Sequence, residues 1–152
     1  MMRKILPISF IALILDIISK QLILHFFKTS ESLSIIKHFF SLTLAKNTGV
    51  AFSMLEGKVP MIILITLIII FLLLTSLKKN CKNKIEVIGY SLVIGGALGN
   101  LLDRIIYGYV IDFLDFNIFG FDFPIFNLAD SFIVIGIFLI LITNFKEGRN
   151  SI

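Results

Sequence analysis

Four long apolar stretches constrain the fold of this chain more than any other feature of its sequence. They cover residues 5–27, 59–77, 87–102 and 127–145. A helix that crosses a bilayer needs about 20 mostly apolar residues, and only self-paired backbone is stable in lipid. We therefore expect one all-α membrane domain over residues 1–152, a bundle of four transmembrane helices. A small extracytoplasmic β-like element and an interfacial loop are expected to complete it.

Composition supports the membrane class and excludes several others. Hydrophobic residues make up 57% of the chain, above the roughly 45–50% of soluble domains. The net charge of +4 does not predict a nucleic-acid partner, because the Lys and Arg residues cluster at the ends of the apolar stretches. The single cysteine, Cys81, excludes an internal disulfide and a cysteine-rich metal site. With His25 and His38 as the two histidines, we expect neither a metal nor a cofactor.

The first apolar stretch resembles a secretory signal peptide only superficially. Arg3 and Lys4 precede it, but Asp16 and Lys20 interrupt it and no Ala-x-Ala-like cleavage site follows. We therefore expect a helix that is retained in the mature protein.

The basic residues predict that both termini are cytoplasmic. Short segments rich in Lys and Arg stay on the cytoplasmic side of a membrane. This arrangement puts Cys81 in a reducing compartment, and Asn47, Asp112 and Asp130 towards the outer face. The basic residues on the inner side would be Arg3, Lys4, Lys78, Lys79, Lys82, Lys84, Lys146 and Arg149, whereas Lys28, Lys37, Lys46, Lys58 and Arg104 are spread over longer outer segments.

The outer segments contain patterns beyond polar linkers. Residues 41–45 alternate in the manner of a strand and lead into a turn signal at 47–49. By itself such a turn more often closes a hairpin than forms a binding site. Residues 113–126 are rich in phenylalanine, as expected for a loop at the lipid–water interface, where Asp115 and Asp122 would be solvated.

Polar residues also occur inside the apolar stretches. Asp16 and Lys20 are four residues apart, so they share a helix face and could pair. A structural pair that orients the helix is the favoured interpretation, and support of an active site is compatible with it. Gly95 and Gly99 have the spacing that lets helix backbones approach closely.

The residues after these glycines indicate a site. Asn100, Asp103 and Arg104 fall on one face of a helix end. Anchoring of the helix could explain Arg104 alone, but it does not readily explain the amide and the carboxylate beside it. A functional role and a structural role both remain open.

Asp112 and Asp130 are the candidate catalytic residues. Carboxylates close to hydrocarbon cost several kcal/mol and are functional candidates by default. Helix capping could account for either Asn127 or Asp130, which are three residues apart, but it does not cover Asp112. Two carboxylates that meet would share a proton and could activate water, as in aspartic proteases.

Five sequence blocks together carry a resemblance to a known family: LDIISK (15–20), NTGVAFS (47–53), GGALGNLLDR (95–104), GYVIDF (108–113) and FNLADS (126–131). In these blocks and in their order, over residues 15–131, the sequence resembles the lipoprotein signal peptidase family, also called signal peptidase II. Small departures occur at Ile17, Ile18 and Val50, none of which has proposed chemistry.

The resemblance implies a monomeric aspartic endopeptidase of the bacterial inner membrane. Its partners would be membrane lipids and a diacylglyceryl-prolipoprotein, which it would cleave before the lipidated cysteine. Asp112 and Asp130 align with the catalytic pair, and Asp16 with Lys20 aligns with a supporting pair. The polar residues around the site would be Asn47, Gly49, Asn100, Arg104 and Asn127, with Gly95, Gly99 and Asp103 in structural roles.

Two other classes of protein compete with this interpretation. A small ion- or proton-coupled transporter could use Asp16, Lys20, Asp112 and Asp130 as a relay, although the sequence contains no inverted repeat. A scaffold protein could use the small-residue helix faces without any catalysis. Peptide cleavage without ion flux would favour the enzyme, and flux without cleavage the transporter.

Overall fold

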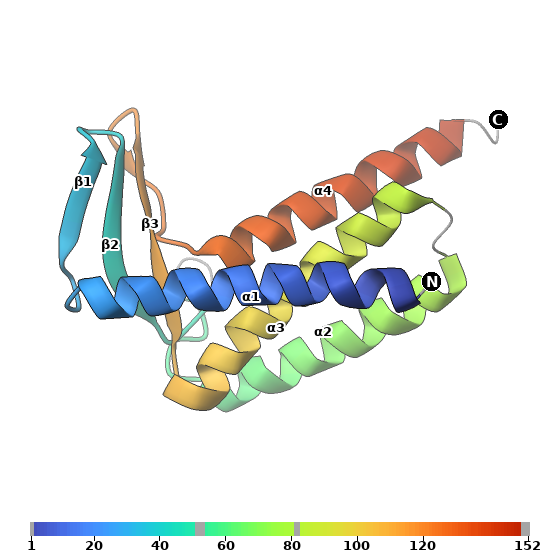
Figure 1. Cartoon of the computed structure of the whole chain (residues 1–152), viewed down its shortest axis with the longest axis horizontal. Coiled ribbons are helices and arrows are strands. Elements are labelled where there is room, and N and C mark those ends of the chain that lie inside the picture. Colours follow the sequence, from blue (N-terminus) through green and yellow to red (C-terminus); the bar gives the residue numbers. More distant parts are fainter. Residues whose placement is uncertain (1, 51–53, 81–82, 150–152) are drawn as a thin grey trace.

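Four helices lie alongside one another, and a small antiparallel sheet stands at one end of them (Figure 1). The computed structural model describes residues 2–50, 54–80 and 83–149. The chain order is α1 (Met2–Phe26), β1 (Ser32–Ile36), β2 (Phe40–Asn47), α2 (Val59–Asn80), α3 (Lys84–Tyr107), β3 (Val110–Ile118), β4 (Phe121–Asp122) and α4 (Leu128–Arg149). Cys81 and Lys82 of the expected cytoplasmic loop, and residues 51–53 of the second block, lie outside the described residues.

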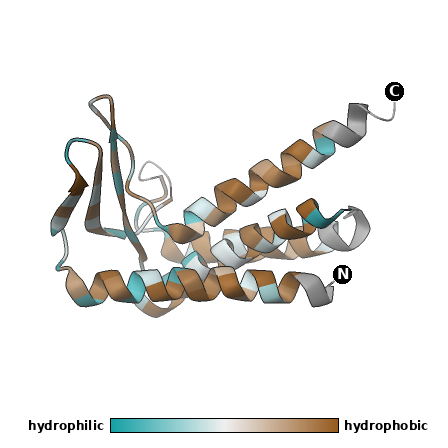
Figure 2. Ribbon diagram, turned by 45° about the horizontal axis from the view of Figure 1, so that its top comes forward, coloured by the Kyte–Doolittle hydropathy of each residue, from teal (hydrophilic) through white to brown (hydrophobic). Residues whose placement is uncertain are grey.

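Each of the four helices contains a segment long and apolar enough to cross a membrane. Apolar residues make up most of each helix in the view of Figure 2, and polar residues are more frequent at the sheet. Both described chain ends lie at the end of the helices opposite the sheet (Figure 1). The structure thus contains the four predicted helices together with the predicted β element.

Helix α3 is the centre of the helical part, because α1, α2 and α4 all pack against it and it is the most buried of the four. Glycines allow the close approach. A side chain at Gly95 would collide with the Ser9 carbonyl of α1, and one at Gly96 with the Ala129 carbonyl of α4. Gly99 lies against the Asp16 carboxylate of α1. Small residues in lipid-facing bundles serve this purpose because packing, and not water exclusion, holds the helices together.

Helix α3 extends beyond the predicted stretch 87–102 at both ends, from Lys84 to Tyr107. Asn83 caps its start by accepting a 2.9 Å hydrogen bond from the Glu86 backbone nitrogen. The helix continues past Leu102 because charged side chains in its last turns have partners inside the protein. It ends where Gly108 adopts a left-handed conformation with φ of 77°, which favours glycine.

The sheet has the order β1-β2-β3-β4, and its β2 strand contains the predicted alternation at 41–45. The prediction of a loop at residues 113–126 is wrong for the parts that form strands, because β3 continues to Ile118 and β4 covers Phe121–Asp122. The aromatic residues of this segment have partners that only the fold supplies. Phe113 is buried beside Ile23 of α1, and the Phe116 ring stacks on Phe40 of β2.

The two acids predicted to be solvated in that segment lie on strands instead. Asp115 is half-buried on β3 and accepts a 2.7 Å hydrogen bond from Thr43 of β2. Asp122 on β4 is exposed and accepts a 2.6 Å hydrogen bond from Asn117. The hydrogen bonds of Asp115 and Asp122 therefore lie within the sheet.

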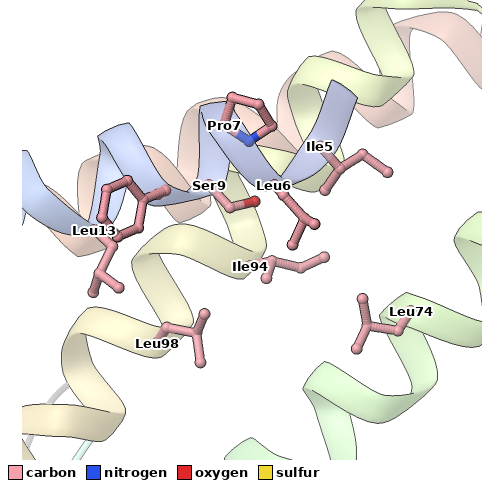
Figure 3. Close-up of a pocket in the computed structure, with 9 residues that line it drawn as sticks. Ile5, Leu6, Pro7, Ser9, Leu13, Leu74, Ile94 and Leu98 are labelled. Atoms are coloured by element: carbon pink, nitrogen blue, oxygen red, sulfur yellow. The ribbon is translucent and has the colours of Figure 1, made fainter. Parts of the chain in front are cut away.

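An apolar pocket of about 400 Å³ lies between α1, α2 and α3, far from the sheet (Figure 3). Ile5, Leu13, Leu74 and Leu98 are among its lining residues. Ser9 is the single polar side chain among the residues lining it, and its hydroxyl donates to the Ser91 carbonyl. None of the residues that line the pocket has a titratable side chain.

Candidate active site

Asp112 lies on β3 where this strand pairs with the end of β2. Its partner across the sheet is Ala45, just beyond an irregularity in the pairing between Leu42 and Ala45. Bulges of this kind redirect side chains and are frequent next to active sites. Asp112 is only 2% exposed, so its carboxyl group is held inside the protein, between the sheet and the helices.

Asp130 lies in the first turn of α4, where it forms a reciprocal cap with Asn127. The Asp130 backbone nitrogen donates to Asn127 Oδ1 over 3.0 Å, and the Asn127 backbone nitrogen donates to Asp130 Oδ2 over 3.2 Å. This is the capping box, here built from Asn and Asp. The capping interpretation therefore applies to both residues, yet it uses only one polar atom of each side chain.

The side-chain amides of Asn127 and Asn100 form a bridge between the two candidate catalytic carboxylates. Asn127 Nδ2 donates to Asp112 Oδ1 over 2.7 Å and to Asn100 Oδ1 over 3.0 Å. Asn100 Nδ2 in turn donates to Asp130 Oδ1 over 2.8 Å. The two aspartates, from β3 and α4, are thus joined through two amide groups.

Asn47 and Gly49, at the end of β2, contact Asp112 and Arg104, and the next element along the chain is α2 and not a paired strand. Asn47 Nδ2 donates a 2.9 Å hydrogen bond to Asp112 Oδ2, and Asn47 Oδ1 accepts one from the Gly49 backbone. Arg104 donates a 2.6 Å hydrogen bond to the Gly49 carbonyl and a weaker one to the Asn100 carbonyl. The Arg104 guanidinium thus holds the chain's own backbone beside Asp112.

The Nε nitrogen of Arg104 takes no part in these hydrogen bonds. This nitrogen is buried and has no hydrogen-bond partner within residues 2–50, 54–80 and 83–149. A buried donor without a partner is costly and is often completed by a ligand or by water. This group is therefore available to an acceptor that enters the site.

The electrostatics of the site raise the pKa of Asp112 from its usual 3.8 to about 7. Burial is the main cause, because it disfavours the charged carboxylate, and the nearby charge of Asp130 acts in the same direction. The hydrogen bonds from Asn47 and Asn127 and the charge of Lys20 oppose the shift without cancelling it. Near neutral pH a substantial fraction of the Asp112 carboxyl groups is therefore protonated.

A buried ionic cluster of Asp16, Lys20 and Asp103 contacts Asn100 of the amide bridge. The Lys20 ammonium is 2.7 Å from Asp16 Oδ2 and 2.9 Å from Asp103 Oδ2. Asp16 and Lys20 are 0% and 1% exposed, and Asp103 is buried as well. The predicted Asp16–Lys20 pair therefore forms, and Asp103 joins it from α3.

Two backbone groups that the residue pattern did not indicate also contribute to this arrangement. The backbone nitrogen of Ala129 donates to Asp16 Oδ1 over 3.0 Å, and that of Ile111 donates to Asp103 Oδ2 over 3.1 Å. Every residue other than proline has a backbone N–H group, so the residue type does not indicate which of these groups bind a carboxylate. Gly96 was also missed as a packing position, although its spacing of three from Gly99 places both on one helix face, towards Ala129.

No group of three or more His, Cys, Asp or Glu residues placed to hold a metal ion occurs among the described residues. The side chains that surround Asp112 and Asp130 are amides and a guanidinium, and these are poor ligands for a divalent cation compared with carboxylates and imidazoles. The arrangement suits acid–base chemistry by the two carboxyl groups themselves.

Comparisons with known proteins agree on one family. The family model described as signal peptidase (SPase) II matches residues 8–146. Lipoprotein signal peptidases of Staphylococcus aureus strains JH9 and Newman are each 41% identical over 144 residues, covering 94% of this chain and 88% of theirs. A bacterial membrane enzyme solved by the in meso method at 2.3 Å resolution superposes with a TM-score of 0.90 at 39% identity, covering 96% of this chain and 90% of that one. A second, solved at 1.9 Å, gives a TM-score of 0.83 at 40% identity, with 91% and 90% covered.

Proposed function

Because the chain belongs to the signal peptidase II family, we propose that it is an aspartic endopeptidase. Its substrates would be bacterial prolipoproteins that carry diacylglycerol on a cysteine, and it would cleave on the N-terminal side of that cysteine. The observation that carries the proposal is the amide bridge from Asp112 through Asn127 and Asn100 to Asp130. It brings two carboxyl groups from different elements to one place.

The proposed reaction needs one proton shared between Asp112 and Asp130. The raised pKa of Asp112 supports this, because its causes are burial and the neighbouring charge of Asp130. One carboxylate takes a proton from a water molecule, and the water oxygen attacks the scissile carbonyl carbon. The protonated partner gives its proton to the developing oxyanion. The carboxyl group that took the water proton then gives it to the leaving amine, and the partner recovers a proton from the hydroxyl of the tetrahedral intermediate as the carbon–nitrogen bond breaks. The pair titrates as a unit, so neither aspartate is assigned as the base.

The amides on either side of Asp112 orient its carboxyl group for this step. Asn47 and Asn127 each donate to a different oxygen of Asp112, so the plane of the carboxyl group is defined. We propose that the free Nε of Arg104 receives a backbone carbonyl of the substrate. A hydrogen bond from a charged donor contributes about 1.5–3 kcal/mol.

The same proposal includes an orientation in the bacterial inner membrane, with a single chain as the working unit. The sheet, Asp112 and Asp130 lie at one end of the helices, and the described chain ends lie at the other (Figure 1). The positive-inside distribution of Lys and Arg favours cytoplasmic termini. The site would then lie near the outer face, where a diacylglyceryl cysteine is presented.

The decisive test incubates the purified full chain with a diacylglyceryl-modified prolipoprotein in detergent micelles. We expect release of the signal peptide by the wild-type protein, whereas Asp112→Asn and Asp130→Asn should each lower the rate by about 1,000-fold or more. Insertion into membranes should be normal in both variants. Wild-type turnover by either variant would refute the proposed roles of the two aspartates.

A second measurement separates the enzyme from a transporter that uses the same buried charges. The protein is reconstituted into vesicles loaded with a pH-sensitive dye, and proton flux is recorded beside cleavage of the lipidated precursor. Cleavage without flux is expected. Flux without cleavage would favour a proton-coupled transporter in which Asp16, Lys20, Asp112 and Asp130 form a relay.

A further inference from the structure

The Lys20 ammonium has three polar partners inside the protein. It forms ion pairs with Asp16 and Asp103 at 2.7 and 2.9 Å and donates a hydrogen bond to Asn100 Oδ1 over 3.0 Å. An ammonium group has three donors and no acceptor, so the number of partners matches its number of donors. Lys20 is 1% exposed, so its charge is balanced inside the protein and not by solvent.

Each carboxylate that holds Lys20 also holds the backbone directly before one of the two candidate catalytic aspartates. Asp103 accepts from the nitrogen of Ile111, the residue before Asp112. Asp16 accepts from the nitrogen of Ala129, the residue before Asp130. Lys20 is therefore connected to both segments that carry the reacting carboxyl groups. Asp103 provides the connection to the segment of Asp112, and Asp16 the connection to the segment of Asp130.

The third contact of Lys20 leads into the amide bridge itself. Asn100 Oδ1 accepts from both Lys20 and Asn127, while Asn100 Nδ2 donates to Asp130. Lys20 thereby defines which end of the Asn100 amide faces Asp130. A reversed amide would place its nitrogen against the ammonium and its oxygen against a carboxylate, and both contacts would be repulsive.

We propose that Lys20, acting through Asp16, Asp103 and Asn100, sets the separation between Asp112 and Asp130. Lys20, Asp16 and Asp103 are positioning residues, because they hold the segments that carry the reacting carboxylates and do not touch them. This inference rests on the proposed peptidase function. It differs from a purely structural ion pair, which would stabilise the packing of α1 on α3 without any effect on the reaction of the folded protein.

The two hydrogen bonds that hold these segments can be removed separately. Asp103→Ala removes the acceptor for Ile111, and Asp16→Ala removes the acceptor for Ala129. Because small misplacements of reacting groups cost about 100-fold in rate, we expect each variant to lose about that factor in kcat. The KM for a diacylglyceryl lipobox peptide should stay nearly unchanged, because neither carboxylate faces the substrate.

The conservative variants Asp103→Asn and Asp16→Asn retain an oxygen that can accept the backbone N–H. They should recover about tenfold of the lost rate, the amount expected of one neutral hydrogen bond at the upper end of its range. Ser9→Ala is the matched control. It removes a buried hydrogen bond from α1 to the Ser91 carbonyl of α3, so it loosens the same pair of helices far from Lys20 and should keep the wild-type kcat.

The pH–rate profile distinguishes positioning from stability. Two carboxyl groups that lie close together titrate at well-separated pH values, and the separation shrinks as they move apart. The profile of each alanine variant should therefore be narrower than that of the wild-type protein. All rates are expressed per folded, monodisperse protein, as judged by circular dichroism and size-exclusion chromatography. If an alanine variant does not fold, the corresponding asparagine variant provides the same comparison, with a kcat about tenfold below wild type.

Folded Asp16 and Asp103 variants with the wild-type kcat and an unchanged pH profile would overturn the positioning role and leave the proposed peptidase intact. A wild-type protein that does not cleave the lipidated peptide would refute the proposed function, and the positioning role with it. An equal loss of kcat in Ser9→Ala would also overturn the inference, because it would show that general loosening of α1 on α3 is sufficient.

Discussion

The Asn127 side-chain nitrogen donates a 2.7 Å hydrogen bond to Asp112 Oδ1, although the same side chain caps α4 through its oxygen. One residue thus connects the start of a helix to a strand of the sheet. This double use explains why capping and function are not competing interpretations for Asn127. It also makes the two roles separable by mutation.

Asn127→Ser should preserve the cap, because serine is a favoured N-cap residue, and remove the donor to Asp112. We expect a large fall in kcat with little loss of thermal stability. Asn127→Ala should lose the same activity and about 1 kcal/mol of stability in addition. Asn83→Ala is the matched control, since the Asn83 oxygen caps α3 through the Glu86 nitrogen. It should lower the melting temperature and leave kcat per folded protein unchanged.

The pH dependence follows from the raised pKa of Asp112. This carboxyl group is protonated below about 7 in the folded protein and below about 3.8 when unfolded. If the reaction needs a shared proton, kcat/KM should fall as the pH rises through about 7. An alkaline limb well above this value would contradict the protonation scheme.

Stability should change over the same range of pH. Between pH 3.8 and about 7 the native state binds the Asp112 proton that the unfolded state has lost, so stability decreases as the pH rises through this window. Asp112→Asn removes the titrating group. The pH dependence of its melting temperature should be flatter than that of the wild-type protein, and an identical slope would exclude Asp112 as its source.

Arg104→Ala should weaken processing less completely than loss of either aspartate. The substitution frees the Gly49 carbonyl and removes the unpaired Nε donor. Arg104→Lys keeps the charge but cannot supply the fork of donors, so we expect partial recovery. The kcat and KM of both variants are measured with a lipidated peptide. Wild-type values of both in Arg104→Ala would count against a role of Arg104 in holding the substrate or the segment at Gly49.

Gly99→Ala should impair the reaction because the added methyl group would collide with the Asp16 carboxylate. Gly89→Ala introduces a comparable collision, 2.8 Å from the Gly136 carbonyl on α4, away from the ionic cluster. Both variants should be less stable. Only Gly99→Ala should lose activity per folded protein, and equal activities would show that the position of Asp16 is unimportant.

The turn between β3 and β4 is expected to contact lipid. Phe119 at this turn is fully exposed, at 106%, and aromatic side chains favour the membrane interface. The chain contains no tryptophan, so Phe119→Trp provides a single fluorophore. Its emission should shift to the blue and be quenched by brominated lipids in liposomes. Leu72→Trp on the exposed side of α2 is the positive reference, and quenching at Phe119→Trp by aqueous iodide alone would place this turn in water.

Much of the fold could be predicted because it depends on local properties of the sequence. The four apolar stretches predict the helices, and the alternation at 41–45 predicts a strand. The prediction failed at 113–126, since phenylalanine-rich segments suit both an interfacial loop and a strand, and the choice was made by pairing with β2. The helical placement of Asp103 and Arg104 was predicted from their spacing after Asn100, and the structure adds the distant residues that satisfy their charges.

The sequence by itself determined that the chain is built for a membrane, that its apolar stretches form helices, and that its polar blocks resemble those of one peptidase family. Only the tertiary structure decided how those blocks meet. Asp16 and Ala129 are 113 residues apart, and Lys20 and Asn100 are 80 apart. Such contacts depend on the packing of α1, α3 and α4. They also depend on which oxygen of each carboxylate already accepts a hydrogen bond from another group. Residue types cannot specify this, because one carboxylate can serve a cap, an ion pair or a reacting group, and here its neighbours in space make the choice.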